Sequence, residues 1–283
     1  MIKIPIVKSD QIQKQIIFSH FNQDARAGLW KKENLIVRDT VKINVFMEGD
    51  FSVFSDETLH YPIYGDICVF PPRKMHYGQI SKPTHINYYQ IDLGVDAFNM
   101  IPDGRCLIER LLEAVADGDS FVRGDQKNGK AVLSVFGEIE NHIRCDEMAL
   151  AFTKVVEAIS LLTRVFLHEA AVPAVSLSMR TAEVLAYIKA HYAEEVSVSE
   201  IAVSVGVSSS YLSRIFKKEI GMGIHEYLNQ YRVMRATELL QSHSVTDTGY
   251  LCGFCDSAHF IAVFKKHMHV TPMNYKKTFS KDL

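Results

Sequence analysis

The chain has 283 residues, a mean hydropathy of +0.00, 47% hydrophobic residues and a formal net charge of −2. These values predict a soluble globular protein with a sizeable core, and the length favours two domains. They exclude a strongly basic chain, so any binding of nucleic acid must depend on local placement of cations rather than on a strong overall field.

The N-terminal end predicts neither export nor membrane insertion. Met1 to Asp10 contain no long apolar run, which argues against a signal peptide and against a membrane span. The cysteines are odd in number and widely spread, which is typical of reduced thiols in the cytoplasm. They are Cys68, Cys106, Cys145, Cys252 and Cys255.

Residues 34–93 have the composition of short β-strands. Turn signals such as Glu48-Gly-Asp50 and Pro71-Pro72 separate the β-rich segments. Short strands with turns at this spacing predict a small β-barrel or sandwich. The predicted strands are 41–47, 51–54, 66–70 and 85–91.

A barrel of this size can hold one small ligand. Aromatic rings stack on sugar-like or planar molecules, and Arg38 could pair with a carboxylate. The alternative is that the aromatic side chains only fill the core, and His76 could equally be a hydrogen-bonded structural residue. The candidate effector-binding residues are Trp30, Arg38, Tyr61, His76 and Tyr89.

From Arg105 the hydrophobic pattern becomes helical, which predicts a short helix over 107–115 and longer helices over about 130–144 and 147–169. The last helix is apolar over much of its circumference, so it needs covering on both sides. Its own barrel can cover one side and a second subunit the other, which predicts a homodimer. The alternative is that both sides are buried within one chain.

Residues 170–176 are small and interrupted by Pro173, which predicts a linker. The predicted domains are therefore residues 1–169 and residues 177–283. From Ser176 onward, 12 Lys and Arg stand against 10 Asp and Glu, so this half carries a net charge of +2 and the rest carries −4.

The segment after Val207 predicts a helix with two distinct faces. Ser208 is a suitable N-cap, because its hydroxyl can accept from a free backbone N–H of the first turn. Leu212, Ile215 and Phe216 form an apolar stripe at helical spacing. The opposite face is small near its start and cationic further along, and is formed by Ser210, Ser213, Arg214 and Lys217. Alone, this pattern also fits an amphipathic helix with a solvated charged face.

The same pattern returns later in the chain. Phe264-Lys265-Lys266 repeats Phe216-Lys217-Lys218 at an offset of 48 residues, and upstream the offset is 47, where Gly206 matches Gly253. Each unit has the order short helix, glycine turn, second helix. Two such units in tandem predict a double helix-turn-helix.

This stretch resembles the DNA-binding domain of the AraC/XylS family of bacterial transcription regulators, over roughly residues 178–278. The residues that carry the resemblance are Ile201-Ala202, Gly206, Tyr211 to Lys218, Gly221, Tyr227-Leu228, Arg232, Ala236, Leu239-Leu240, Gly253-Phe254, His259-Phe260, Phe264-Lys265-Lys266, Thr271-Pro272 and Tyr275. The resemblance implies that the second helix of each unit enters the major groove and that a long helix joins the units. Gly65 to His76 likewise resembles the cupin-like effector domain of such regulators.

The implied fold is α+β: an N-terminal cupin-like β-barrel with flanking dimerisation helices, then an all-α tandem helix-turn-helix domain. Arg214 is expected to reach base edges, and Lys217 and Lys218 phosphates. The expected DNA-binding residues are Ser208, Ser209, Ser210, Ser213, Arg214, Lys217, Lys218, Ser257, Ala258, His259, Ile261, Ala262, Lys265 and Lys266. Ala258, Ile261 and Ala262 offer no side-chain hydrogen bond, so the second helix is expected to contribute less to base recognition.

The expected function is a bacterial transcription regulator, associated with the nucleoid when bound to DNA, with double-stranded DNA, a sugar-like or small acidic effector and a second copy as partners. RNA polymerase is a further candidate partner. The alternatives are a cupin-type enzyme and a ligand-independent DNA-binding protein with a vestigial barrel. The sequence leaves activation and repression open.

No metal or cofactor is expected. Metal-dependent cupins carry a His-x-His motif, which is absent before the linker, and His60, His76 and His85 lie on separate segments. Cys252-Gly-Phe-Cys255 has the spacing of a redox or zinc pair, but it lies in a predicted turn with no second ligand pair nearby.

Overall fold

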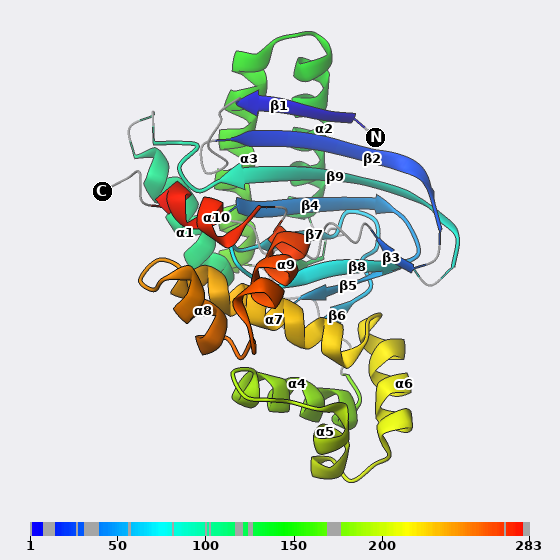
Figure 1. Ribbon diagram of the computed structural model, residues 1–283. Helices are drawn as coiled ribbons and strands as arrows, with labels where there is room; N and C mark the ends of the chain where they lie inside the picture. Colours follow the sequence, from blue (N-terminus) through cyan, green and yellow to red (C-terminus); the bar gives the residue numbers. More distant parts are fainter. Residues whose placement is uncertain are drawn as a thin grey trace.

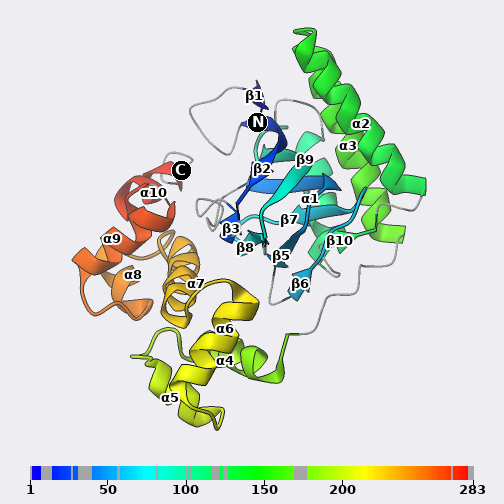
Figure 2. The same ribbon diagram turned by 90° about the vertical axis from the view of Figure 1, so that its right-hand side faces the viewer.

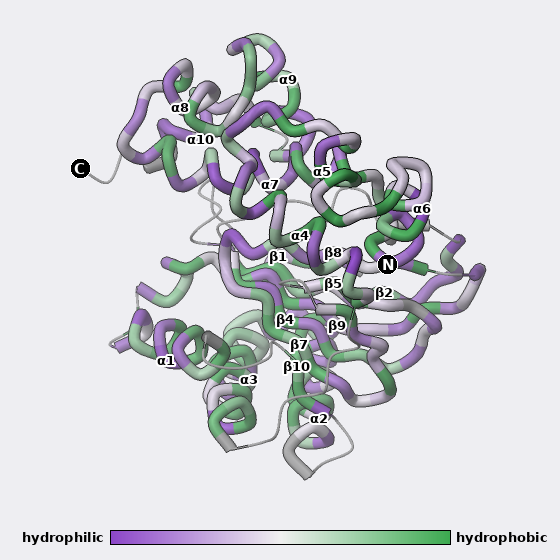
Figure 3. The backbone as a smooth tube through the Cα atoms, turned by 90° about the horizontal axis from the view of Figure 1, so that it is seen from below, coloured by the Kyte–Doolittle hydropathy of each residue, from purple (hydrophilic) through white to green (hydrophobic). Residues whose placement is uncertain are grey.

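The computed structural model describes residues 2–7, 15–26, 28–30, 40–55, 58–80, 82–99, 101, 103–116, 121–123, 127–168, 177–268 and 270–279. The described chain forms three layers: the C-terminal helices, the strands, and helices α1–α3 (Figure 3). The predicted linker lies outside the described residues. Among those described, none of the helices combines the length and the apolar character needed to span a membrane.

The N-terminal part is built from two antiparallel sheets. The first has six strands in the order β1-β2-β9-β4-β7-β10, and the second has four in the order β3-β8-β5-β6 (Figure 1). The bounds are β1 Ile2–Val7, β2 Ile16–Ala25, β3 Gly28–Trp30, β4 Thr40–Glu48, β5 Phe51–Ser55, β6 Thr58–His60, β7 Ile67–Phe70, β8 His76–Ile80, β9 Thr84–Gly94 and β10 Phe121–Val122.

The two faces of the six-stranded sheet differ because side chains alternate along each strand. On β4, Val41, Ile43 and Val45 are fully buried in the core beneath the helices. Lys42 and Asn44 lie on the other face, which looks toward the four-stranded sheet. The four predicted strands are confirmed, whereas β1, β2, β3, β6, β8 and β10 were not predicted. The polar residues of β2 hide its pattern, and its ten-residue pairing with β9 is a long-range contact.

Helices α1 (Gly104–Ala116), α2 (Lys127–Arg144) and α3 (Met148–His168) cover the outer face of the six-stranded sheet (Figure 2). They match the predicted helices to within about one turn. The inner side of α3 is completely buried in this chain at Val155, Leu162 and Val165. The helix is predicted to contact a second subunit, and both Leu161 and Leu162 are candidates for that contact. For Leu162 this is wrong, because its side chain already fills the core of its own chain.

The C-terminal part consists only of helices in the described residues. The bounds are α4 Met179–His191, α5 Val198–Ser204, α6 Ser209–Ile220, α7 Ile224–Leu239, α8 Val245–Leu251, α9 Ser257–Met268 and α10 Pro272–Phe279. Helices α5 and α6 form the first unit, α8 and α9 form the second, and α7 joins them. The predicted tandem arrangement is confirmed.

The two parts of the chain contact each other through the first unit. Phe54 and Tyr77 of the four-stranded sheet, with Met75 just before β8, belong to the same apolar cluster as Leu212, Phe216 and other residues of the first unit. Beside this contact lies a cleft of about 370 Å³ between the segment Pro72–Met75 and helix α7. The core of the second unit contains no described residue from the sheets.

Candidate nucleic-acid interface

Helix α6 begins and ends where its sequence dictates. The Ser208 hydroxyl accepts from the Tyr211 N–H at 3.3 Å, so the predicted N-cap is confirmed. Gly221 ends the helix in the left-handed conformation, with φ 80°. Leu212, Phe216 and Ile220 are fully buried, and Ile215 is only half-buried.

The opposite face of α6 is exposed. Ser210, Ser213, Arg214 and Lys217 are all exposed, as are Ser208 and Lys218, whereas Ser209 is half-buried. The Arg214 guanidinium lies 5.8 Å from the centre of the Tyr211 ring, which places it near the start of the helix. The structure therefore brings together on one surface the residues predicted from the first unit.

Helix α9 presents a different surface. Ala258, His259, Ile261, Ala262, Lys265 and Lys266 are exposed, and Ser257 is half-buried. Asp256 caps the helix by accepting from the His259 N–H at 2.7 Å, as the match with Ser208 predicts. Apart from His259, the outer face is thus apolar in its first turns and cationic only near its end. It can contact thymine methyl groups and phosphates, but its early turns offer few side-chain hydrogen bonds to bases.

The supporting helices α5 and α8 are capped alike. Ser197 and Glu200 form a capping box, with the Glu200 N–H donating to the Ser197 hydroxyl at 3.2 Å. The backbone and side-chain hydrogen bonds from Ser197 lower the pKa of the Glu200 carboxyl. Ser244 accepts from the Asp247 N–H at 3.1 Å at the start of α8. Equivalent caps in equivalent places confirm the internal repeat.

The two units are fixed to each other by a close backbone contact. A Cβ on Gly253 would lie 2.6 Å from the Tyr192 carbonyl oxygen, so only glycine fits between α8 and the end of α4. Arg232 of α7 stabilises the same junction between the two units, because it donates hydrogen bonds to the carbonyl oxygens of Tyr192 and Glu194, each at 2.7 Å. Sequence reasoning gave Arg232 no role of its own, because its partners are carbonyls that carry no sequence signal.

The cysteine pair lies at this junction. Cys252 is fully buried and Cys255 exposed, and both are free thiols. Burial raises the pKa of the Cys252 thiol to about 12, which makes it a structural residue rather than a reactive one. Among the described residues, no three His, Cys, Asp or Glu side chains lie close enough together to hold a metal ion.

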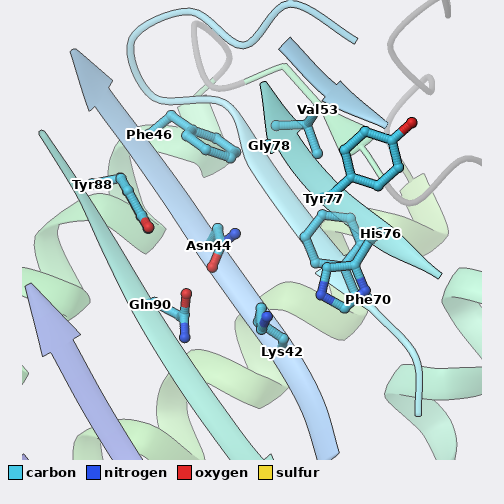
Figure 4. Close-up of a pocket in the computed structure, with 10 residues that line it drawn as sticks. All are labelled: Lys42, Asn44, Phe46, Val53, Phe70, His76, Tyr77, Gly78, Tyr88 and Gln90. Atoms are coloured by element: carbon cyan, nitrogen blue, oxygen red, sulfur yellow. The ribbon is translucent and has the colours of Figure 1, made fainter. Parts of the chain in front are cut away.

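A small polar cavity lies between the two sheets (Figure 4). It measures about 30 Å³, which is enough for one or two water molecules. The lining residues are Lys42, Asn44, Phe46, Val53, Phe70, His76, Tyr77, Gly78, Tyr88 and Gln90. Of the predicted effector-binding residues whose side chains the structure describes, only His76 lines this cavity, with its ring stacked on Phe70 at 4.0 Å between centroids. Its Nδ1 lies 3.0 Å from the Lys74 carbonyl oxygen, so it also has the structural hydrogen bond of the alternative interpretation.

On the same face of the six-stranded sheet as Lys42 and Asn44, three buried oxygen atoms have no hydrogen-bond partner among the described residues, and of these three residues only Asn44 lines the cavity. They are Thr40 Oγ1, Asn44 Oδ1 and Asp92 Oδ1. Asp92 and Lys42 stand directly opposite each other on β9 and β4, as do Gln90 and Asn44. The interior between the sheets is therefore polar at one end, and it has spare hydrogen-bond acceptors.

The other predicted effector residues lie elsewhere. Tyr61 is about half-exposed on the surface and does not line the cavity. Tyr89 faces the helices, because alternation along β9 turns it away from Tyr88 and Gln90, and its hydroxyl donates to Glu140 Oε2 at 2.9 Å. Neither of these two residues lines the cavity, and their role in effector binding stays a prediction. Arg38 and the side chain of Trp30 lie outside the described residues.

Tyr89 belongs to a polar cluster beneath α2. Glu140 accepts from Arg144 at 2.6 Å, and His20 Nδ1 lies 3.0 Å from the same carboxylate. Burial would raise the pKa of the Glu140 carboxyl, but the hydrogen bonds from Arg144, His20 and Tyr89 outweigh it and leave this pKa lowered. The cluster therefore ties β2 and β9 to α2 through a carboxylate.

Known proteins share the helical part of this chain. A family model described as a helix-turn-helix domain matches residues 179–278. A transcriptional regulator of the helix-turn-helix type from Pseudoalteromonas carrageenovora is 39% identical over 94 residues, covering 33% of this chain and 57% of the relative. Another from Staphylococcus aureus (strain COL) is 26% identical over 248 residues, covering 84% of this chain and 31% of the relative.

Among solved structures, a transcriptional regulator from Chromobacterium violaceum, described as containing an AraC-type DNA-binding domain, is 32% identical. The match covers 36% of this chain and 93% of that chain, with a TM-score of 0.34. The chain spans about a third to just over half the length of the curated relatives that it matches.

Proposed function

The chain belongs to the AraC-type helix-turn-helix transcriptional regulators, with a C-terminal helix-turn-helix domain after a β-rich domain, and we propose that it reads DNA chiefly through helix α6. This family assignment replaces the alternative of a cupin-type enzyme. The observation that carries the proposal is the exposed face of α6, where Ser210, Ser213 and Arg214 stand together above a fully buried apolar stripe.

The residues of this face have different roles. Arg214 can donate two parallel hydrogen bonds to a guanine edge, and Ser210 and Ser213 are small enough to allow close approach to the groove. Lys217 and Lys218 lie further along the helix and contact phosphates. Because the C-terminal half has a net charge of only +2, these few cations supply much of the attraction to DNA.

The second unit contributes mainly non-specific contacts in this proposal. Ala258 and Ala262 replace the polar residues of α6, so at these positions α9 reads only thymine methyl groups or groove shape. Lys265 and Lys266 are exposed and bind phosphates. A histidine suits a left-handed helix end less well than glycine does, which predicts a weaker end of the second helix at His269, but this residue lies outside the described residues. Glycine inside a helix lowers its stability, which predicts that Gly249 weakens α8. A Cβ there would nevertheless come within 3.0 Å of the Phe260 ring, so glycine allows α8 and α9 to pack closely.

The function is tested by selecting binding sites from random duplexes with the full-length protein. Each base pair of the selected site is then changed, and affinity is measured at several salt concentrations. We expect steep base preferences, each about 1–3 kcal/mol, only beneath α6, with a salt slope that reflects phosphate contacts. Failure to enrich any sequence would refute the function. Equally strong G·C preferences beneath α9 would refute the unequal roles.

The proposal extends to a small-molecule effector in the cupin-like domain. The support is the set of three buried acceptor atoms between the sheets, which a ligand rich in hydroxyl groups can satisfy. Lys42 and Asp92 bring opposite charges to this interior, which favours a neutral, sugar-like ligand over an acid. The cavity of about 30 Å³ admits only part of such a molecule unless the sheets move apart.

A thermal-shift screen of the full chain compares neutral sugars and polyols with small organic acids. Stabilisation by about 2.7 kcal/mol is expected when a true ligand is present at 100 times its Kd. A ligand site is supported if Asn44→Leu abolishes the shift while the unliganded variant remains folded. No shift with any compound would favour the alternative of a vestigial domain.

A further inference from the structure

Strand β8 lies between the inter-sheet cavity and the helix that reads DNA. His76, Tyr77 and Gly78 of this strand all line the cavity. The Tyr77 hydroxyl points away from Lys42, Asn44 and Gln90, as Figure 4 shows. The same strand thus touches the cavity and faces the C-terminal domain.

The Tyr77 hydroxyl donates a hydrogen bond to the carbonyl oxygen of Ile220, the last residue of α6. The last carbonyls of a helix have no partner within the helix, so they need a donor from elsewhere. Tyr77 is 2% exposed and Ile220 is 0% exposed, so water does not readily replace this bond. Burial, with a smaller contribution from Tyr227, raises the pKa of the Tyr77 hydroxyl and keeps it protonated as a donor.

A second route joins the same strand to the same helix. Tyr77 stacks on Phe54 of the neighbouring strand β5, with centroids 5.0 Å apart. Phe54 meets the edge of Tyr227 at 6.3 Å, and Tyr227 meets Phe216 of α6 at 5.6 Å. This row of rings supports the buried side of α6, opposite the exposed face that carries Arg214.

We propose that Tyr77 is a positioning residue, which holds the end of α6 in its DNA-binding orientation and couples that helix to the inter-sheet cavity. This inference rests on the proposed role of α6 as the reading helix. Because the contact supports α6 from behind and leaves its outer face exposed, it favours binding rather than blocking it. A molecule that displaces β8 would move α6 directly, whereas the second unit has no described contact of this kind in its core.

The test uses Tyr77→Phe in the full-length protein, which removes the hydroxyl and keeps the ring. Affinity is measured for the duplex selected by the wild type and for a random duplex. One buried hydrogen bond corresponds to about a threefold to tenfold change in an equilibrium constant, so a loss of this size is expected for the selected duplex only. Amide hydrogen exchange without DNA should accelerate at residues 217–221 and stay unchanged at residues 265–268.

Two further variants complete the design. Phe54→Leu interrupts the row of rings and should reproduce the loss of discrimination. Tyr64→Phe removes a hydroxyl from the same domain at a residue that is exposed on the surface, and it should leave discrimination unchanged.

Each outcome bears on the inference. Equal losses on both duplexes, unchanged exchange at residues 217–221, or tighter binding by Tyr77→Phe would overturn it. If the wild type selects no duplex, the proposed function fails, while the exchange measurement still decides whether Tyr77 restrains α6.

Discussion

At the scale of single residues, chemistry separates base reading from phosphate binding on α6. Arg214→Ala removes a guanidinium group that can donate two hydrogen bonds to guanine. We therefore expect a loss of about 1–3 kcal/mol of binding free energy on the selected site and a relaxed preference at one base pair. Lys217→Ala should weaken binding to every duplex alike. It should also reduce the slope of the logarithm of the binding constant against the logarithm of salt concentration by about one. Titrations at several salt concentrations distinguish the two. Equal losses on specific and random duplexes for Arg214→Ala would contradict its role.

Glu140 gives a residue-scale prediction about pH. Its folded-state pKa is lowered, so the carboxylate stabilises the fold above its unfolded pKa, and this stability is lost as the pH falls through the folded value. Glu140→Gln should therefore reduce the free energy of unfolding at pH 7, by about 1–3 kcal/mol, with a smaller deficit near pH 3 to 4.

Urea denaturation of both proteins at the two pH values measures the difference for Glu140→Gln. Glu109→Gln, which breaks an exposed ion pair with Arg105, is the control and should change little at either pH. A Glu140→Gln deficit that does not depend on pH would show that packing, not charge, explains the effect.

At the scale of elements, the glycine turns of the two helix-turn-helix units can be compared with each other. Gly206 and Gly253 occupy equivalent turns with φ of 70° and 81°, but only Gly253 meets neighbouring backbone atoms. Both alanine variants incur the cost of a left-handed conformation, about 1–2 kcal/mol. Gly253→Ala should cost more, because Tyr192 and Ala193 must move.

Thermal or chemical denaturation measures both costs, and the difference between the two variants isolates the contact between the units. Gly253→Ala should also lose the preferred spacing between the sites bound by α6 and α9, while Gly206→Ala keeps it. Identical stability losses and identical spacing preferences would show that the contact of Gly253 with Tyr192 and Ala193 does not determine how the two units are arranged.

At the scale of the whole molecule, we predict a homodimer formed through α3. Leu162 fills the core of its own chain, whereas Leu161 is only partly buried beside it. Leu161→Asp should therefore give a folded monomer, because an unpaired carboxylate opposes association across an apolar surface. Leu162→Asp should instead unfold the N-terminal domain. Sedimentation and circular dichroism separate the two outcomes, and a wild-type protein that is monomeric at micromolar concentration would refute the dimer.

For the whole molecule, local sequence patterns predicted some features of the fold and not others. The caps at Ser208 and Ser244, the apolar stripe of α6 and the repeat of Gly206 at Gly253 were all predictable, because helices and turns are determined by residues within a few positions of each other. For that reason the sequence alone determined the tandem units and the exposed face of α6 that is proposed to bind DNA.

Only the tertiary structure decided the rest. Side chains alternate between the two faces along β9, and this alternation placed Tyr89 under α2 rather than in the cavity. Strand β2 could be recognised only through its pairing with β9. The bond from Tyr77 to Ile220 joins residues 143 positions apart, and its acceptor is a carbonyl that every residue possesses. Contacts between distant segments depend on how whole elements pack, and no local spacing in the sequence encodes them.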